Sequence, residues 1–426
     1  MDKTNVKYNA YIKILEEELA PAMGCTEPIA IAYGAAKARE VLGALPDEIV
    51  VEASGNIIKN VKSVVVPNTG GLHGIEAAAA AGAVAGKPEL LLEVISQVTP
   101  GQQEEMRAYL KEHPVRVEFL DGELVFDIRI TLKKGADTAV VRIANYHTNI
   151  VHIERNGQVL LDLPVEADDE SGLTDRSLLT MADIYDFAQT VDVGDVKELL
   201  DRQIQCNMAI SQEGLTHSYG ANIGQVIRDT SRPDDPIARA KAAAAAGSDA
   251  RMGGCEMPVI INSGSGNQGM TASVPVIVYA QGTGASQEKL YRALALSNLI
   301  TIHQKTRIGR LSAYCGAVSA GAAAGAGIAY LDGGGYEEII HTVVNALAIV
   351  SGMICDGAKA SCAGKIAAAI DAGVLGYRMY QQGQQFYGGD GILSHGVEKT
   401  LDNVGRLGKI GMRSTDKEIL QIMLQT

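Results

Sequence analysis

The sequence predicts an α+β protein, with an antiparallel sheet in its N-terminal part and a mostly helical C-terminal part that carries most catalytic residues. Between residues 115 and 161, apolar and polar residues alternate with the period of strands that are buried on one face. After about residue 178 the pattern is almost wholly helical. A chain of 426 residues is long enough for two domains. We therefore divide it into residues 1–177 and 178–426 and expect both parts to contribute to one active site.

The N-terminal part begins with two predicted helices. The first covers residues 5–20, and the second begins at Thr26-Glu27-Pro28, with Pro in its first turn, and continues to about Val41. This places Cys25 at a helix N-terminus. The elements expected next are β structure over 48–66 with a turn near Ser54-Gly55-Asn56, an Ala-rich helix from the 68–74 loop to about Ala85, and a helix over 99–112.

The alternating segment predicts an antiparallel meander, because turn dipeptides such as Lys134-Gly135 and Asn156-Gly157 separate its runs. Its strands are expected at 115–119, 124–133, 138–145 and 150–154. Residues 162–176 are acidic and polar and predict a linker. The helices expected after it cover 180–188, 193–212, 235–250, 268–282, 286–301, 316–329, 335–351 and 363–373. The Gly-rich tail from residue 378 is expected to be irregular.

Composition excludes some function classes. A net charge of −13 argues against nucleic acid and anionic membranes as partners, since phosphate contacts need a basic face. The first residues show no signal-peptide pattern, and the Ala-rich runs at 77–86 and 317–329 are too short or too Gly-rich to span a membrane. We expect a cytoplasmic protein. Its Ala/Gly-rich helices are suited either to a tightly packed core or to a homodimer interface.

Three cysteines lie in Gly-flanked settings in the C-terminal part: Cys315, Cys355 and Cys362. Their spacing matches neither the paired cysteines of a zinc ribbon nor the runs of a ferredoxin. From spacing alone they are either buried small residues or the ligands of a three-thiolate metal site. Cys25 is a fourth candidate, because a helix N-terminus can lower the pKa of a thiol and suit it to act as base, nucleophile or ligand. A packed cysteine beside a turn explains it equally well.

A polar Gly-rich run precedes the helix predicted at 268–282. It contributes Asn262, Ser263, Ser265, Gly266, Asn267 and Gln268, whose amides, hydroxyls and backbone N–H groups suit a carboxylate or phosphate. An ordinary Gly-rich turn is the alternative. The 68–74 loop with His73 is a weaker candidate of the same kind. His217 lies in a similar loop, and the cationic segment from Lys305 to Arg310 could bind a carboxylate or be an ordinary surface loop.

Pro-Ala-Met-Gly-Cys-Thr-Glu-Pro at 21–28, Asn-Ser-Gly-Ser-Gly-Asn-Gln-Gly at 262–269 and the three C-terminal cysteines resemble the L-cysteine desulfidase family. That family is related to the alpha domain of iron–sulfur L-serine dehydratases. The resemblance covers nearly the whole chain and implies an oxygen-sensitive 4Fe-4S cluster with a non-redox role. It places Cys315, Cys355 and Cys362 on the ligand positions and Cys25 on the reactive cysteine. The narrower spacing of the last two cysteines, and the lack of a recognisable extra domain, favour the desulfidase side.

The predicted function is therefore a carbon–sulfur lyase that converts L-cysteine to pyruvate, ammonia and hydrogen sulfide. Cys25 is the expected base, with His73 or His217 as alternatives, and the 262–269 loop is expected to hold the substrate carboxylate, with His73 as a further substrate contact. L-serine dehydration on the same cluster is the first alternative. A non-catalytic iron–sulfur sensor or a zinc-stabilised binding module is the second.

Overall fold

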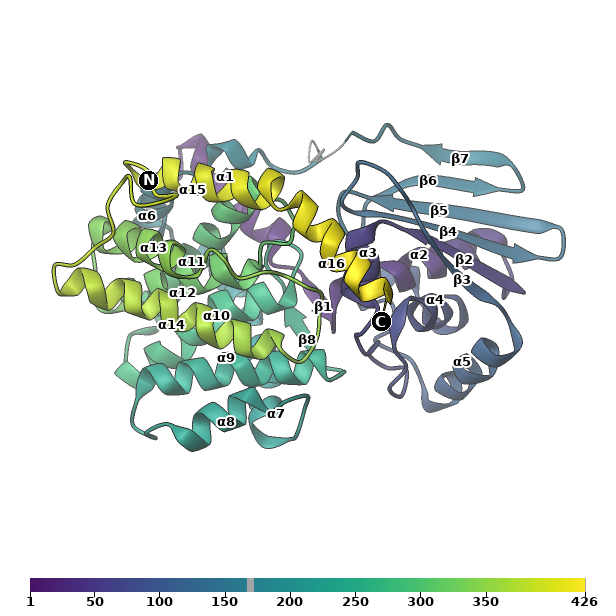
Figure 1. Cartoon of the computed structure of the whole chain (residues 1–426), viewed down its shortest axis with the longest axis horizontal. Helices are drawn as coiled ribbons and strands as arrows, with labels where there is room; N and C mark the ends of the chain where they lie inside the picture. The colour runs from purple at the N-terminus through teal and green to yellow at the C-terminus, as the bar shows by residue number, and fades with distance from the viewer. Residues whose placement is uncertain (167–171, 426) are drawn as a thin grey trace.

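The computed structural model describes residues 1–166 and 172–425, and it confirms an α+β fold. Figure 1 shows a sheet with a few helices on one side of the molecule and a large group of helices on the other. Part of the predicted linker, residues 167–171, lies outside the described residues. Among the described residues, no helix combines the length and apolar character needed to cross a membrane.

The sheet has six strands in the order β3-β2-β4-β5-β6-β7. The strands are β2 (Glu48–Ala53), β3 (Val115–Phe119), β4 (Asp127–Lys134), β5 (Asp137–Ala144), β6 (Ile150–Arg155) and β7 (Gln158–Asp162). The predicted meander is confirmed for β4 to β6, which pair antiparallel in sequence order, and β7, which was not among the predicted strands, continues it antiparallel to β6. It is wrong for β3, which pairs parallel with β2. A parallel partner requires a crossover connection, and here helices lie between β2 and β3 in the chain.

One face of the sheet is buried under α2 (Thr26–Leu42), as the alternating pattern requires. Ile128, Ile130 and Leu132 of β4 are fully buried, whereas Arg129 between them is exposed. Gly34 allows the helix to approach the strand closely, because a Cβ atom there would lie 2.8 Å from the Ile130 side chain. Next to α2 lies α4 (Gly74–Ala85), and α5 (Pro100–Glu112) follows it in the chain.

The β structure predicted over 48–66 is correct only as far as Ala53. Ser54 begins the helix α3 (Gly55–Val61) instead. The buried residues Ile57, Ile58 and Val61 follow the spacing of one helix face, and a short apolar run of this kind fits a strand or a helix equally well.

The helical part contains all eight helices predicted after the linker, although α11 and α14 continue seven and eight residues beyond their predicted ends and α8 was not predicted. Its elements are α1 (Val6–Glu18), α6 (Met181–Thr190), α7 (Val193–Thr216), α8 (Ile223–Thr230), α9 (Pro236–Met252), α10 (Gly266–Thr283), α11 (Gln287–Ile308), α12 (Gly316–Leu331), α13 (Tyr336–Val350), α14 (Cys362–Gln381), α15 (Val397–Arg406) and α16 (Arg413–Gln425), with the short helices η1 (Pro88–Glu93), η2 (Arg176–Leu178) and η3 (Leu407–Gly411). Small residues set the closest contacts: a Cβ atom on Gly325 of α12 would lie 2.6 Å from the α14 backbone.

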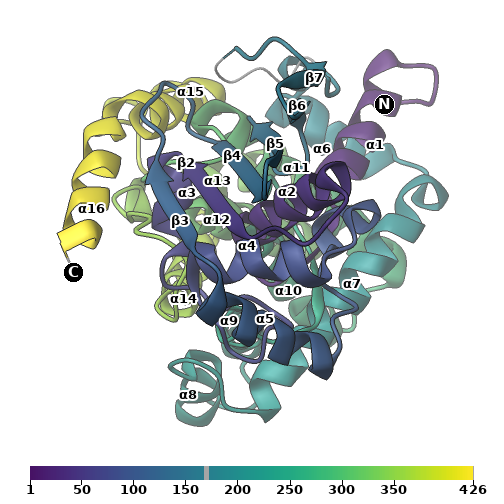
Figure 2. The ribbon, with the colours of Figure 1, turned by 90° about the vertical axis from the view of Figure 1, so that its right-hand side faces the viewer.

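The tail predicted to be irregular contains α15 and α16, so this prediction is wrong. Val397, Leu401 and Val404 recur at helical spacing and are buried, which gives α15 one apolar face. The last helix, α16, leaves the helical part and contacts α3 beside the sheet (Figure 2). In the opposite direction, α1 from the N-terminal part packs against α7 and α11.

Candidate functional site

A two-stranded antiparallel pair that the sequence did not reveal brings the Cys25 segment to the helical part. β1 (Pro21–Met23) pairs with β8 (Pro258–Ile260), and Pro21 lies opposite Ile260. Cys25 follows β1 and caps the N-terminus of α2. The turn after β8 leads into α10, and the Thr26 hydroxyl donates a 2.8 Å hydrogen bond to the carbonyl of Gly264 in that turn. The two predicted elements are therefore joined directly.

Backbone pairing also places two of the C-terminal cysteines close together. Tyr314 and Ile354 form an antiparallel bridge, the Cys315 N–H donates to the Met353 carbonyl at 3.1 Å, and the Cys355 N–H donates to the Ala313 carbonyl at 2.6 Å. Cys362 begins α14, and its Sγ lies 3.8 Å from the Gly357 carbonyl oxygen. The loop between them turns at Gly357, where φ is +94°.

One cavity of about 100 Å³ collects these groups, and we call it the cysteine cavity. Its lining includes all four predicted cysteines, Cys25, Cys315, Cys355 and Cys362, together with Ser265, Asn267 and Gln268 of the predicted anion loop. Cys25 and Cys362 also share a small apolar cluster with Val64, Met252 and Ala358. Residues separated by more than 300 positions in the sequence therefore line a single space.

The other residues of the predicted loop shape the turn. The buried Asn262 donates through Nδ2 to the Asn298 side chain at 3.0 Å and accepts a 2.9 Å hydrogen bond from the Ser263 hydroxyl. Gly266 is required for close packing, because a Cβ atom there would lie 2.4 Å from Nε of Arg251.

The two candidate histidines do not line the cysteine cavity. His73 is exposed at the start of α4, and the His217 side chain is 66 % exposed beside Glu213. The structure gives neither histidine a place near the cysteines, so they are unsuited to act as the base.

Four helices begin at the cysteine cavity. Cys25 caps α2, Ser265 caps α10, Cys315 caps α12, and Cys362 is the first residue of α14. Each helix N-terminus presents unpaired N–H groups and a partial positive charge. Their convergence favours anions in this space, whether thiolates or a substrate carboxylate.

The Cys25 thiol is nevertheless held in its neutral form. Its Sγ–H donates to Oε2 of Glu27 at 3.2 Å, and Oε1 of Glu27 accepts a 3.1 Å hydrogen bond from Asn60. Burial, followed by the charge of Glu27, raises the pKa of Cys25 well above its usual value. The expectation that the helix N-terminus would lower this pKa is therefore wrong, because burial and a neighbouring carboxylate outweigh the helix dipole. Glu27 was not recognised as a site residue, although it stands two residues after Cys25.

Two buried cations complete the site. Arg251, at the end of α9, is 2 % exposed, lines the cysteine cavity and has no hydrogen bond or ion pair from its side chain within the described residues. Lys305 of α11 is 4 % exposed and equally unpaired there. Burial lowers the pKa of Lys305 to about 8, although Cys355 and Cys315 act in the opposite direction. Arg251 gave no signal in the sequence apart from a charge at the end of an Ala-rich helix.

Further polar atoms in the cavity lack partners. Oδ1 of Asn267 and Oε1 of Gln268 are buried without a hydrogen bond. The thiol pKa of Cys315 is raised to about 12 by burial and by Cys355, and burial also raises the pKa of Cys362. Within the described residues, no three or more His, Cys, Asp or Glu side chains are arranged to hold a single metal ion.

The fold is α+β, and buried cysteines together with four helix N-termini form its candidate site. The sequence matches the serine dehydratase alpha chain family over residues 89–421, a region that includes the three C-terminal cysteines and the 262–269 turn and begins after Cys25. The chain belongs to this family, and its predicted relationship to the serine dehydratase alpha domain is confirmed.

Full-length relatives are UPF0597 proteins. The chain is 60 % identical over 424 residues to the UPF0597 protein of Desulfitobacterium hafniense, a match that covers 100 % of this chain and 98 % of that protein. It is 48 % identical to the one from Treponema denticola, covering 100 % and 99 %, and 52 % identical to the one from Lachnoclostridium phytofermentans, covering 98 % and 100 %.

Proposed function

We propose that this protein is a carbon–sulfur lyase that converts L-cysteine to pyruvate, ammonia and hydrogen sulfide with a non-redox 4Fe-4S cluster. The observation that carries the proposal is the cysteine cavity, in which three cysteines, the Cys25–Glu27 pair and an unpaired Arg251 line one space. A hydrophobic core without a binding function would not contain the buried Arg251 or the amide oxygens of Asn267 and Gln268 that lack a hydrogen bond in the described residues.

The residues present fit such a cluster. Cys315, Cys355 and Cys362 offer three soft sulfur donors, the donor type that holds iron–sulfur clusters. Cysteines that bind different irons of one cluster stand farther apart than ligands of one ion, so the proposal does not need a single-ion geometry. Lys305, Lys365 and the helix N-termini are positioned to offset the negative charge of three thiolates. When bound, a cluster with three protein ligands supplies a Lewis-acidic iron that favours departure of the substrate sulfur.

The chain's own residues orient the substrate. The Arg251 guanidinium is planar and suits a carboxylate, and Ser265, Asn267 and Gln268 at the start of α10 line the same cavity. We assign the α-carboxylate to Arg251, Ser265 and Asn267. This fixes Cα relative to the Cys25–Glu27 pair, and correct orientation alone accounts for much of an enzyme's rate.

The Cys25–Glu27 pair moves the proton. Because the Cys25 thiol is neutral, its proton first passes to Glu27, to which it is already hydrogen-bonded. The resulting thiolate then removes the Cα proton of the substrate. The Cα–H electron pair forms the Cα=Cβ bond, and the Cβ–S electron pair leaves with sulfur as sulfide. The aminoacrylate product, once released, tautomerises and is hydrolysed to pyruvate and ammonia.

One feature favours cysteine as the substrate. Cys25 and Cys362 are flanked by the apolar side chains of Val64, Met252 and Ala358, whose one hydrogen bond among the described residues is a weak 3.8 Å contact from Asn267 to the Met252 sulfur. A thiol tolerates such surroundings better than a serine hydroxyl, which must be hydrogen-bonded when buried. L-serine dehydration remains the second candidate, because the family match is to serine dehydratase alpha chains.

The test is anaerobic reconstitution with iron and sulfide, followed by assays of sulfide from L-cysteine and pyruvate from L-serine. We expect iron binding with a thiolate-to-iron absorption band and a preference for cysteine. Cys315→Ser should abolish iron binding, whereas Cys25→Ala should retain iron and lose turnover. Cys206→Ser, remote from the cavity, is the control. A protein that binds iron without turnover would favour a sensor, and one that binds only zinc would favour a binding module; either result would contradict the proposal.

A further inference from the structure

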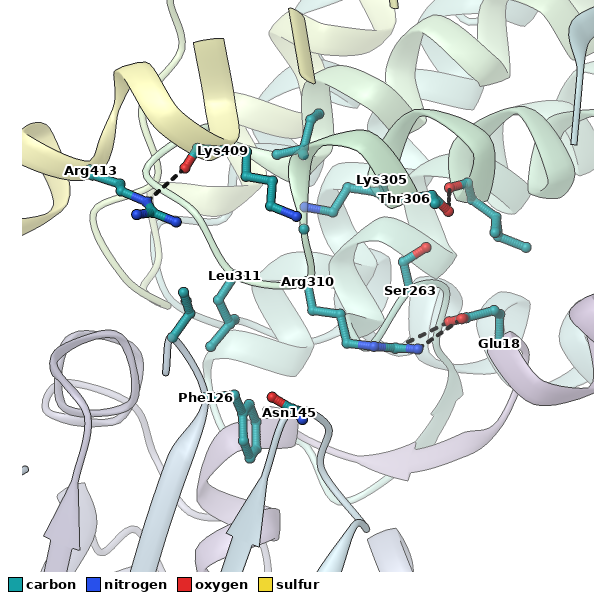
Figure 3. A pocket seen from close by; sticks show the side chains of 14 residues that line it. Glu18, Phe126, Asn145, Ser263, Lys305, Thr306, Arg310, Leu311, Lys409 and Arg413 are labelled. Carbon is teal, nitrogen blue, oxygen red and sulfur yellow. Dashed lines mark hydrogen bonds and ion pairs between the residues drawn. The ribbon is translucent and has the colours of Figure 1, made fainter. Parts of the chain in front are cut away.

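A second, more cationic cavity adjoins the cysteine cavity. Its volume is about 230 Å³, and four of its lining residues are basic: Lys305, Arg310, Lys409 and Arg413. Figure 3 shows the Lys305 and Lys409 side chains extending toward one another from different elements, with Arg413 beside them. We call this space the cationic cavity.

The two cavities share a wall. Lys305, Arg310 and Leu311 line both of them, whereas Lys409 and Arg413 line only the cationic cavity. Exposure falls along the cationic cavity toward this wall. Arg413 is exposed, Lys409 is half-buried and Lys305 is buried. The cationic cavity therefore extends from the surface to the wall that it shares with the cysteine cavity.

The charge of Lys305, at the inner end of the cationic cavity, faces no carboxylate partner among the described residues. Glu18 is the one carboxylate among the described residues that line this cavity, and it accepts hydrogen bonds from Arg310 at 2.9 and 3.3 Å and from Arg176 at 2.7 Å. Glu18 is thus fully engaged by two guanidinium groups. Lys305, at the inner end, has no hydrogen bond or ion pair from its side chain in the described part of the chain.

An unpaired cation that is 4 % exposed is unfavourable for folding, because burial removes water without supplying a partner. Besides its place near the thiols of Cys315 and Cys355, its position at the wall common to both cavities puts it beside any anion that passes between them. The substrate under the proposed function carries a carboxylate, and Arg251 offers that carboxylate a destination in the cysteine cavity.

We infer that the cationic cavity is an anion-selective entrance, through which carboxylate-bearing small molecules pass Lys305 to reach the cysteine cavity. The identity of the substrate rests on the proposed function, but the selectivity of the entrance does not. Clefts lined by one sign of charge raise the local concentration of oppositely charged ligands.

The test measures anion selectivity without turnover. Metal-free, reduced protein is alkylated with iodoacetate or iodoacetamide, which differ in charge, and the modification of Cys355 and Cys362 is quantified by mass spectrometry. The ratio of the two rates cancels changes in thiol pKa, because both reagents attack the thiolate. Cys206 is half-buried, lines neither cavity and serves as the internal reference.

The wild-type ratio at Cys355 and Cys362 should exceed that at Cys206. Lys305→Met should lower it about tenfold, the scale of electrostatic focusing by a charged cleft, and Lys305→Arg should restore most of it. Lys409→Met should also lower it, although Lys409 does not line the cysteine cavity. Lys241→Met removes a remote lysine paired with Asp371 and should leave the ratio unchanged.

Equal ratios at Cys355, Cys362 and Cys206 in the wild type would overturn the inference. So would a decrease in Lys305→Met with none in Lys409→Met, because Lys305 would then act only inside the cysteine cavity. Loss of selectivity in both variants would support the entrance even if the protein showed no lyase activity. Lyase activity with no anion selectivity would leave the proposed function intact and remove the entrance.

Discussion

Replacing Lys305 with methionine should stabilise the folded, metal-free protein. Lys305 is buried without a partner in the described residues, and methionine has a similar length but no charge. Most substitutions of buried residues are destabilising. An increase in stability here would indicate that the lysine is retained for a purpose other than folding.

The magnitude follows from the pKa of Lys305. Burial lowers it from 10.5 to about 8, and at about 1.36 kcal/mol per pH unit this corresponds to about 3 kcal/mol. Below pH 8 the lysine is charged in both states, and the folded state bears the full desolvation. Between pH 8 and 10.5 the unfolded chain binds a proton that the folded protein has lost, so wild-type stability rises with pH. Lys305→Met should therefore be more stable by about 3 kcal/mol at pH 7, and this difference should vanish as the pH approaches 10.5.

Urea denaturation of metal-free, reduced protein at several pH values between 7 and 10 measures this difference. Groups remote from Lys305 contribute equally to both proteins, so the difference between variant and wild type reports on Lys305 and on its interaction with Cys315 and Cys355. Lys241→Met, which removes a lysine from a surface ion pair, should change the free energy of unfolding by less than about 1 kcal/mol. The reasoning would be refuted if Lys305→Met were no more stable than the wild type at pH 7, or if its advantage did not shrink with rising pH.

Two further substitutions test how the site is held. Asp416→Asn should lower the free energy of unfolding by about 3–5 kcal/mol, because it leaves the buried Lys59 ammonium without a carboxylate partner. Urea denaturation measures this loss, and Asp371→Asn is the control. The control removes the carboxylate of a surface ion pair and should lower the free energy of unfolding by less than about 1 kcal/mol. Equal losses in the two variants would contradict the prediction. Gly269→Ala should destabilise by about 1–3 kcal/mol or more, since its Cβ would lie 2.1 Å from a backbone carbonyl oxygen of β8. Gly364→Ala, with nothing within 4 Å, should stabilise by up to about 1 kcal/mol, and equal melting temperatures for the two Gly variants would show that β8 yields to the added methyl group.

Most of the fold could be predicted from sequence because long periodic segments specify their own structure. The strands β4 to β6 and the long helices α7 and α9 to α14 all carry such periodicity, whereas the short elements β7 and α8 were not predicted. The elements predicted wrongly are those in which the local sequence pattern and the packing in the folded protein favour different structures. The run around Ile57 and Ile58 suits either a strand or a helix, and the glycines that precede α15 obscured its apolar face. β3 is parallel to its neighbour because that neighbour is β2, and the alternating pattern of β3 does not indicate which strand it pairs with.

The site was predictable only where its residues carry a local signature. The cysteines and the turn before α10 have one, because Gly-flanked thiols and a polar Gly-rich run are uncommon in a plain core. Arg251 and Glu27 act through burial, as does Lys305, of which the sequence showed only a cationic segment, and burial in this site comes from elements distant in sequence. The pKa of Cys25 shows the same limit: the helix N-terminus is visible in the sequence, whereas the burial that outweighs it is not.

The segments that carry Cys315 and Cys355 are contacted by residues from the N-terminal part and from the last helix of the chain. Lys59 of α3 donates to the Cys355 carbonyl at 3.3 Å and pairs with Asp416 of α16. Asp416 in turn accepts a 2.9 Å hydrogen bond from the Ala313 N–H, two residues before Cys315. Asp416 therefore connects, directly or through Lys59, the backbones of two candidate ligands, and it belongs to a helix that packs against α3 beside the sheet. The backbone pairing of the Cys315 and Cys355 segments is therefore supported from outside the helical part, because separation of α16 from α3 would remove the Asp416 and Lys59 contacts of both segments together.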